Sequence, residues 1–113
     1  MVITVKSFDK QLINRLWSLK SDNIQLQQPF QKDFDPNRLY EIFVYLKEGT
    51  SFLLDLSAIL MLIKSYKSSS PKKPEVTIVS NKRLEMKVNQ LIISYQEKIE
   101  IKIIEEEKET MEK

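Results

Sequence analysis

The sequence predicts an α+β domain with two layers, in which a mixed β-sheet of four or five strands packs against about three helices and includes a C-terminal β-hairpin. Short β-branched runs with alternating polarity lie near both ends of the chain, which is typical of strands. Between them, apolar residues recur three and four positions apart, which is typical of amphipathic helices. The 113 residues match the commonest size of one domain, so we expect a single domain over residues 1–104 and a charged, disordered tail over 105–113.

The chain is predicted to begin with a strand, a helix and a second strand. The segment Met1–Lys6 (MVITVK) is rich in β-branched residues and reads as a buried strand. Ser7 or Asp9 can cap the free N–H groups of a helix over Lys10–Lys20. Ile24–Gln27 alternates apolar and polar residues and predicts a short strand that is solvated on one face.

A second helix is predicted over Asn37–Lys47. Pro36 tolerates the first helical position, because its missing N–H costs nothing there. Gly49, the only glycine in the chain, follows where a helix would end. We therefore expect Gly49 to take a positive φ as a helix C-cap.

The most apolar part of the sequence is predicted to be a third helix, capped by Thr50 or Ser51 and ending near Lys67. At 12 residues, the run from Phe52 to Ile63 is too short to span a bilayer, which needs about 20 residues. Its remaining apolar residues make it apolar almost all round, so we expect it to be covered on more than one side. Its core stripe is expected to comprise Phe52, Leu56, Ile59, Leu60 and Ile63.

The last third of the chain is predicted to be mostly β-structure. After a loop over Ser68–Pro74, Val76–Val79 and Leu84–Val88 bracket a short turn and predict a β-hairpin. Gln90–Glu97 fits a helix and a strand equally well, and this choice stays open. Ile99–Ile103 alternates cleanly and predicts a last strand.

The composition argues against an enzyme and against a bound cofactor or metal. With no histidine and no cysteine, the usual general base, the usual nucleophile pairs and the commonest metal ligands are missing. A single glycine cannot build a phosphate-binding loop. Asp33 and Asp35 have the spacing of turn or capping acids and are not expected to bind a metal.

Four residues of the apolar helix are candidates for contact with a protein partner, because this helix is larger than a small sheet can cover. Asp55 interrupts the apolar run, and we favour a role near the helix start, where the dipole stabilises an acid, over a partner-facing charge. The four candidates are Leu53, Asp55, Met61 and Leu62.

The net charge of +2 is too small to indicate a nucleic-acid partner, but the charge is unevenly distributed. Residues 64–98 hold eight basic and three acidic side chains, whereas residues 99–113 hold three basic and six acidic ones. A solvated basic surface is favoured over nucleic-acid binding, because no aromatic motif accompanies the lysines. Trp17, among aliphatic neighbours, is expected in the core. The candidate basic patch comprises Lys64, Lys67, Lys72, Lys73, Lys82 and Arg83.

The predicted order of elements resembles the effector-associated constant component family of bacterial conflict and signalling systems. The resemblance covers roughly residues 2–90, and it departs from the family where Glu48-Gly49-Thr50 replaces a glycine-rich break and Ser68-Ser69-Ser70 replaces arginines. It implies a small non-enzymatic module that connects an effector domain to a sensor. The matching pieces are Ile3 to Val5, Leu16 to Leu19, Ile24 to Pro29, Leu39 to Leu46, Gly49 to Lys67 and Val76 to Val88.

Asp55-Leu56-Ser57 also resembles a strand of the anti-sigma-factor antagonist (STAS) domains, although the serine and glycine that follow in that family are missing. We rank this resemblance below the first. The N-terminal residues show no signal-peptide pattern, so a cytoplasmic protein is expected. The sequence thus predicts a non-catalytic adaptor with a protein partner, either an effector or sensor domain or a second copy of itself. Weak nucleic-acid binding through the lysine-rich loop and hairpin is the alternative.

Overall fold

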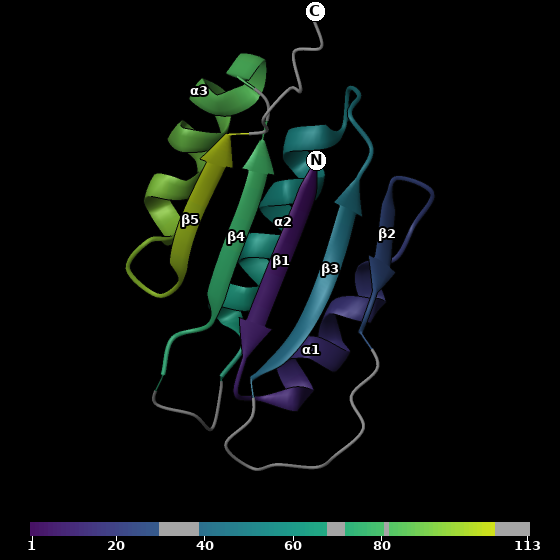
Figure 1. Ribbon diagram of the computed structural model, residues 1–113, viewed down its shortest axis with the longest axis vertical. Helices are drawn as coiled ribbons and strands as arrows, with labels where there is room; N and C mark the ends of the chain where they lie inside the picture. Colours follow the sequence, from purple (N-terminus) through teal and green to yellow (C-terminus); the bar gives the residue numbers. More distant parts are fainter. Residues whose placement is uncertain (30–38, 68–71, 81, 106–113) are drawn as a thin grey trace, which may run out of the picture.

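The described residues form one five-stranded mixed β-sheet with three α-helices, as the sequence predicts (Figure 1). The computed structural model describes residues 1–29, 39–67, 72–80 and 82–105. Figure 1 shows all three described helices behind the sheet. The α+β class and the two-layer architecture are therefore confirmed.

The strand order is β2-β3-β1-β4-β5, with the N-terminal strand in the middle. β1 (Val2–Ser7) pairs antiparallel with β3 (Tyr40–Leu46) on one side and with β4 (Glu75–Ser80) on the other. β2 (Ile24–Gln27) pairs antiparallel with β3, and β5 (Glu100–Glu105) pairs parallel with β4.

The first six elements have a recurrent topology. β1, α1, β2, β3, α2 and β4 follow the β-α-β-β-α-β order of the ferredoxin-like, or split βαβ, arrangement, in which each crossover leaves space for one intervening strand. α3 and β5 extend this unit, and a helix is the usual connection between parallel strands such as β4 and β5.

α1 (Lys10–Leu16) begins where the sequence predicts. Asp9 is its N-cap residue and accepts a hydrogen bond from the backbone N–H of Gln11 at 2.9 Å. The chain then tightens into a 3₁₀ turn over Trp17–Leu19, so the α-helix ends earlier than the predicted Lys20. Leu12, Ile13 and Leu16 are buried.

The hydrophobic core lies between the sheet and the helices. α2 (Phe52–Ser65) contributes all five residues of its predicted stripe, each of which is buried. The strands contribute alternate residues, as expected for a sheet with one covered face. Core residues of the three central strands are Ile3, Val5, Ile42, Val44, Leu46, Val76 and Ile78.

The helix predicted over Asn37–Lys47 is wrong, because the described part of this segment forms β3. Ile42, Val44 and Leu46 are buried while Tyr45 is exposed, which is the period of a strand. Six of its residues pair with β1, so β3 lies inside the sheet and is fixed by contacts far away in the sequence. The β-branched and aromatic residues of YEIFVYL agree with this structure.

The prediction for Gly49 is wrong for the same reason. Gly49 lies between β3 and α2, and no described residue has a positive φ. Its carbonyl accepts a hydrogen bond from the N–H of Phe52 at 3.2 Å. A Cβ at this position would meet nothing within 4 Å, so no close contact requires glycine.

The predicted C-terminal β-hairpin is also wrong in its second half. β4 forms, but the next segment is α3 (Lys82–Ile92), followed by a 3₁₀ turn over Ile93–Tyr95. Val88, Ile92 and Tyr95 are buried, at helical spacing, and Met86 faces solvent. Within Gln90–Glu97, the first three residues end α3, the next three form the 3₁₀ turn, and the last two lie in a turn, so the segment is not a strand. The predicted last strand forms as β5.

Candidate functional site

The outward face of α2 carries two large apolar side chains. Leu54 is 74% exposed and Met61 is 52% exposed, although the helix buries five other apolar residues. The two are seven positions apart, so they lie two turns apart on one face, about 10.5 Å along the axis. The helix is therefore covered toward the sheet, and its outward side, which carries Leu54 and Met61, is exposed.

α3 repeats this pattern. Met86 in α3 is 72% exposed, and Ile93, the first residue of the 3₁₀ turn that continues this helix, is 69% exposed. Leu54 and Met61 lie two and nine positions after Phe52, the first inward residue of α2. Met86 and Ile93 lie two and nine positions after Leu84, the first inward residue of α3. Both helices pack on the same face of the sheet (Figure 1), and the high exposure of both pairs places them on the sides of the helices that face away from the sheet. We call Leu54, Met61, Met86 and Ile93 the outward apolar set.

The four predicted partner-facing residues lie on different sides of α2. Leu53 and Leu62 are half-buried and pack against the core. Asp55 lies in the first turn and accepts a hydrogen bond from the hydroxyl of Ser51 at 3.1 Å. Met61 alone is mostly exposed. Leu54 is the most exposed apolar residue of α2, although it was not among the four predicted candidates. Its position opposite the buried stripe could have predicted this exposure.

The structure separates the candidate basic patch into groups at the two ends of β4. Lys67, Lys72 and Lys73 lie near the start of β4, whereas Lys82 and Arg83 begin α3 just after the end of β4 (Figure 1). A six-residue strand spans roughly 17–20 Å, which separates the two groups. Lys64 and Lys72 lie over aromatic rings, those of Tyr95 at 5.5 Å and Phe8 at 4.8 Å.

A hollow of about 400 Å³ lies between the end of α1 and the last turn of α2. Both helices end here, and a cation near a helix C-terminus is stabilised by the dipole. Arg15 in the last turn of α1 and Lys67 beyond the end of α2 are thereby accounted for without a ligand. The lining residues are Arg15, Ser18, Leu62, Ser65, Tyr66 and Lys67.

Trp17 is not a core residue, contrary to the prediction. Its side chain is 36% exposed, at the start of the 3₁₀ turn after α1. The indole Nε1–H donates a hydrogen bond to Oε1 of Gln28 at 2.6 Å. The tryptophan therefore ties this turn to the residues after β2 at the surface.

No described helix or strand covers the face of the sheet opposite the helices (Figure 1), which we call the uncovered face, and the strand register arranges its side chains in rows. An apolar row crosses four strands at one end of the face and an acidic row crosses the same strands at the other end, with a middle row between them. The apolar row is Tyr45, Val2, Val79 and Ile104; the middle row includes Phe43, Thr4, Thr77 and Lys102; the acidic row is Glu41, Lys6, Glu75 and Glu100.

The acidic row contains three carboxylates and one ammonium group. Lys6 lies 3.7 Å from a carboxylate oxygen of Glu41. Glu75 and Glu100 are register partners in the parallel pair β4–β5, and neither forms an ion pair with any described residue. Like charges directly opposite one another in a sheet destabilise it.

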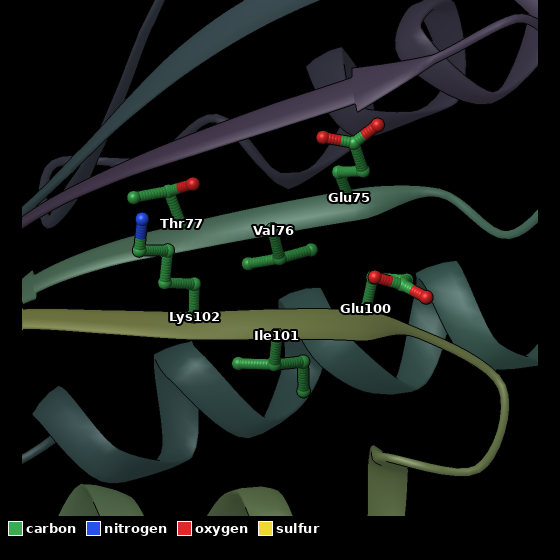
Figure 2. A pocket seen from close by; sticks show the side chains of 6 residues that line it. All are labelled: Glu75, Val76, Thr77, Glu100, Ile101 and Lys102. Atoms are coloured by element: carbon green, nitrogen blue, oxygen red, sulfur yellow. The ribbon is translucent and has the colours of Figure 1, made fainter.

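A hollow of about 150 Å³ lies over β4 and β5 at this end of the face. Figure 2 shows Glu75, Thr77 and Lys102 on one side of the two strands, with Val76 and Ile101 pointing toward the helices. The Lys102 side chain extends from β5 across to Thr77, its register partner on β4, and away from the two carboxylates.

Other sequence-based candidates fall elsewhere. Asp33, Asp35 and residues 106–113 of the predicted tail lie outside the described residues. Asp55-Leu56-Ser57, which resembles a strand of STAS domains, lies in α2. Within the described ranges, no three metal-ligating side chains come together, and no helix combines the length and hydropathy needed to cross a membrane.

Comparisons with known proteins give no relative. No protein-family model, no curated protein and no solved structure matches this chain. The interpretation of its surfaces therefore depends on its own residues.

Proposed function

We propose that this protein is a non-catalytic interaction module that binds a partner protein through the outward faces of α2 and α3. The observation that carries the proposal is the outward apolar set: four large apolar side chains, each more than half exposed, on two helices of the same layer. Single exposed apolar residues are ordinary on protein surfaces. Two pairs with the same spacing and the same orientation form a two-by-two array instead, which a partner surface could bury together.

The size of the apolar contribution is consistent with a docking surface. Fully burying one such side chain contributes about 1.5–3 kcal/mol, so four contribute on the order of 6–12 kcal/mol at most. The loss of translational and rotational freedom on association costs roughly 4–15 kcal/mol. The set can therefore anchor a complex, and the surrounding polar contacts would set its specificity.

The resemblance to the effector-associated constant component family is the ground for naming the partner as an effector or sensor domain in the cytoplasm. Two of the matching pieces differ from the expected structure. Leu39 to Leu46 was expected to be a helix and lies largely in β3. Val76 to Val88 was expected to be a β-hairpin, but its second half lies in α3. The proposal of an interaction module rests on the outward apolar set and is independent of that resemblance.

Nucleic-acid binding is the weaker alternative. A phosphate backbone is held by cations that lie along one continuous track. Lys67, Lys72 and Lys73 are separated from Lys82 and Arg83 by the length of β4. The lack of a mobility shift with single-stranded or duplex nucleic acid at low salt would end this alternative.

Site-specific photocrosslinking in the source cells tests the proposal. A photoreactive phenylalanine analogue replaces Leu54 in one variant and Ile93 in another. We expect one discrete crosslinked product, the same for both positions, because the two residues face the same partner. Mass spectrometry then identifies the partner, and a product of twice 13.4 kDa identifies a second copy of the chain instead.

A matched variant carries the same analogue at Lys98, which is exposed but not part of the outward apolar set. The product should be absent there, and it should be lost when Met61→Glu is combined with the analogue at Ile93. Equal labelling at all three positions, or no discrete product at Leu54 and Ile93, would contradict the proposal.

A further inference from the structure

We propose that the uncovered face of the sheet is a second docking surface, and that its occupant is an amphipathic basic helix of a partner protein. The inference rests on the proposed function only in treating the protein as an interaction module. It uses residues on the opposite side of the molecule from the outward apolar set. A protein with two such faces can bind two partners at once, which is what an adaptor requires.

The apolar row is the first argument, because a sheet face that meets only water is expected to carry polar side chains. A sheet that meets water on one side alternates apolar-in with polar-out. In the two central strands of this face, Val2 and Val79 point away from the core, and Tyr45 and Ile104 flank them. Tyr45 and Ile104 are exposed. A second layer would bury all four side chains.

The acidic row is the second argument, because its three carboxylates share a single cation, Lys6. Glu75 and Glu100 stand side by side in parallel register, about 4.8 Å apart between strands. Lys6 is already paired with Glu41, and Lys102 extends away from the two carboxylates toward Thr77 (Figure 2). A lysine or arginine side chain from a partner, seated at the hollow over β4 and β5, would pair with both carboxylates.

The distance between the two rows defines the shape of the occupant. Successive side chains on one face of a strand are about 6.7 Å apart, so the apolar and acidic rows are separated by roughly 13 Å. An α-helix rises 1.5 Å per residue, so it covers this distance in about nine residues. Residues seven positions apart lie on the same face of a helix, about 10.5 Å apart along its axis, and a long lysine or arginine side chain spans the rest of the distance. The occupant is therefore a helix along the strands, with apolar residues over Val2 and Val79 and a cation about seven positions away on the same face.

Charge complementarity favours this occupant over two others. If a second copy packed face to face with its two-fold axis along the strands, the acidic rows would oppose each other. With the axis across the strands, the acidic row would cover the apolar row. Nucleic acid is disfavoured because the acidic row repels phosphate.

A helical peptide of about 18 residues, apolar in one half and lysine-rich in the other, is the probe; a control peptide has glutamate in place of lysine. Fluorescence anisotropy at low salt measures the affinity. We expect the lysine peptide alone to bind wild-type protein, and the double substitution Glu75→Gln with Glu100→Gln to weaken binding about tenfold. Val79→Glu should weaken it similarly, while Leu54→Glu with Met61→Glu leaves it unchanged.

Each contrary result overturns the inference. The inference is wrong if the lysine peptide fails to bind wild-type protein. It is also wrong if the double glutamine variant binds the peptide as tightly as wild-type protein does. A dimer that Val79→Glu converts to monomer in sedimentation velocity shows that the occupant is a second copy. Because Leu54 and Met61 are unchanged in the sheet-face variants, loss of peptide binding and loss of the crosslink at α2 identify failures of different surfaces.

Discussion

Single residues on α2 show how closely inward and outward positions adjoin. Leu54 and Leu56 are chemically identical and two positions apart, yet Leu54 is 74% exposed and Leu56 is fully buried. At 100° per residue, two positions turn a side chain by about 200°, from the core to solvent. The difference between a core residue and a member of the outward apolar set is thus set by its angle on the helix and not by its type.

This pair gives a prediction for stability. Leu56→Ala should lower the free energy of unfolding by about 3 kcal/mol, because it leaves a cavity in a closely packed core. Leu54→Ala should change it by less than about 0.5 kcal/mol, because no buried contact is lost. Urea denaturation followed by circular dichroism measures both values. Similar losses for the two variants would show that Leu54 is covered in the free protein, and the outward apolar set would lose its main member.

At the scale of elements, the sequence predicts best where the pattern is local and long. The α2 stripe from Phe52 to Ile63 repeats over three turns, and all five of its predicted residues are buried. β1 and the Asp9 cap were likewise predictable, because a β-branched run and a capping side chain act within a few residues.

The two wrong elements were short and ambiguous. Tyr40–Leu46 offers apolar residues that fit both periods, and its pairing with β1, about 40 residues earlier, makes it a strand. Leu84, Met86 and Val88 alternate like a strand over five residues, whereas the longer spacing through Ile92 and Tyr95 is that of a helix. Only the longer window distinguishes the two.

The candidate surfaces were harder to predict than the core. The outward position of Leu54 follows from the stripe, but the rows of the uncovered face depend on strand order and register. Glu75 and Glu100 are 25 positions apart in sequence, and only the parallel pairing of β4 with β5 makes them neighbours.

That pairing gives a prediction at the scale of elements. Glu100→Lys should raise the free energy of unfolding by about 0.5 kcal/mol at low salt, since it replaces a like-charge pair by an opposite-charge pair. Glu100→Gln should give a smaller gain, because it removes repulsion without adding attraction. The gains should shrink in 1 M salt, where the Debye length is only about 3 Å. Thermal denaturation at both salt concentrations measures them. A loss of stability in the lysine variant would contradict the parallel register.

On the scale of the whole molecule, the topology concentrates stability in the middle of the sheet. β1 is hydrogen-bonded on both sides, and its partners β3 and β4 lie about 40 and 75 residues away in sequence. The first strand therefore becomes fixed only when most of the chain has assembled around it. β2 and β5 are the edge strands, each paired on one side.

Amide hydrogen exchange should follow this arrangement. The amides of Ile3 and Val5 should exchange only through global unfolding, because opening β1 breaks both of its ladders and exposes core side chains. Those of β5 should exchange faster, through detachment of β5 with α3 from the split βαβ unit. Substituting Ile101→Ala should speed exchange in β5 and leave the exchange of Ile3 nearly unchanged, as nuclear magnetic resonance can measure residue by residue. If the amides of all five strands exchange at one rate, α3 and β5 unfold together with the split βαβ unit. The uncovered face then unfolds only as a whole.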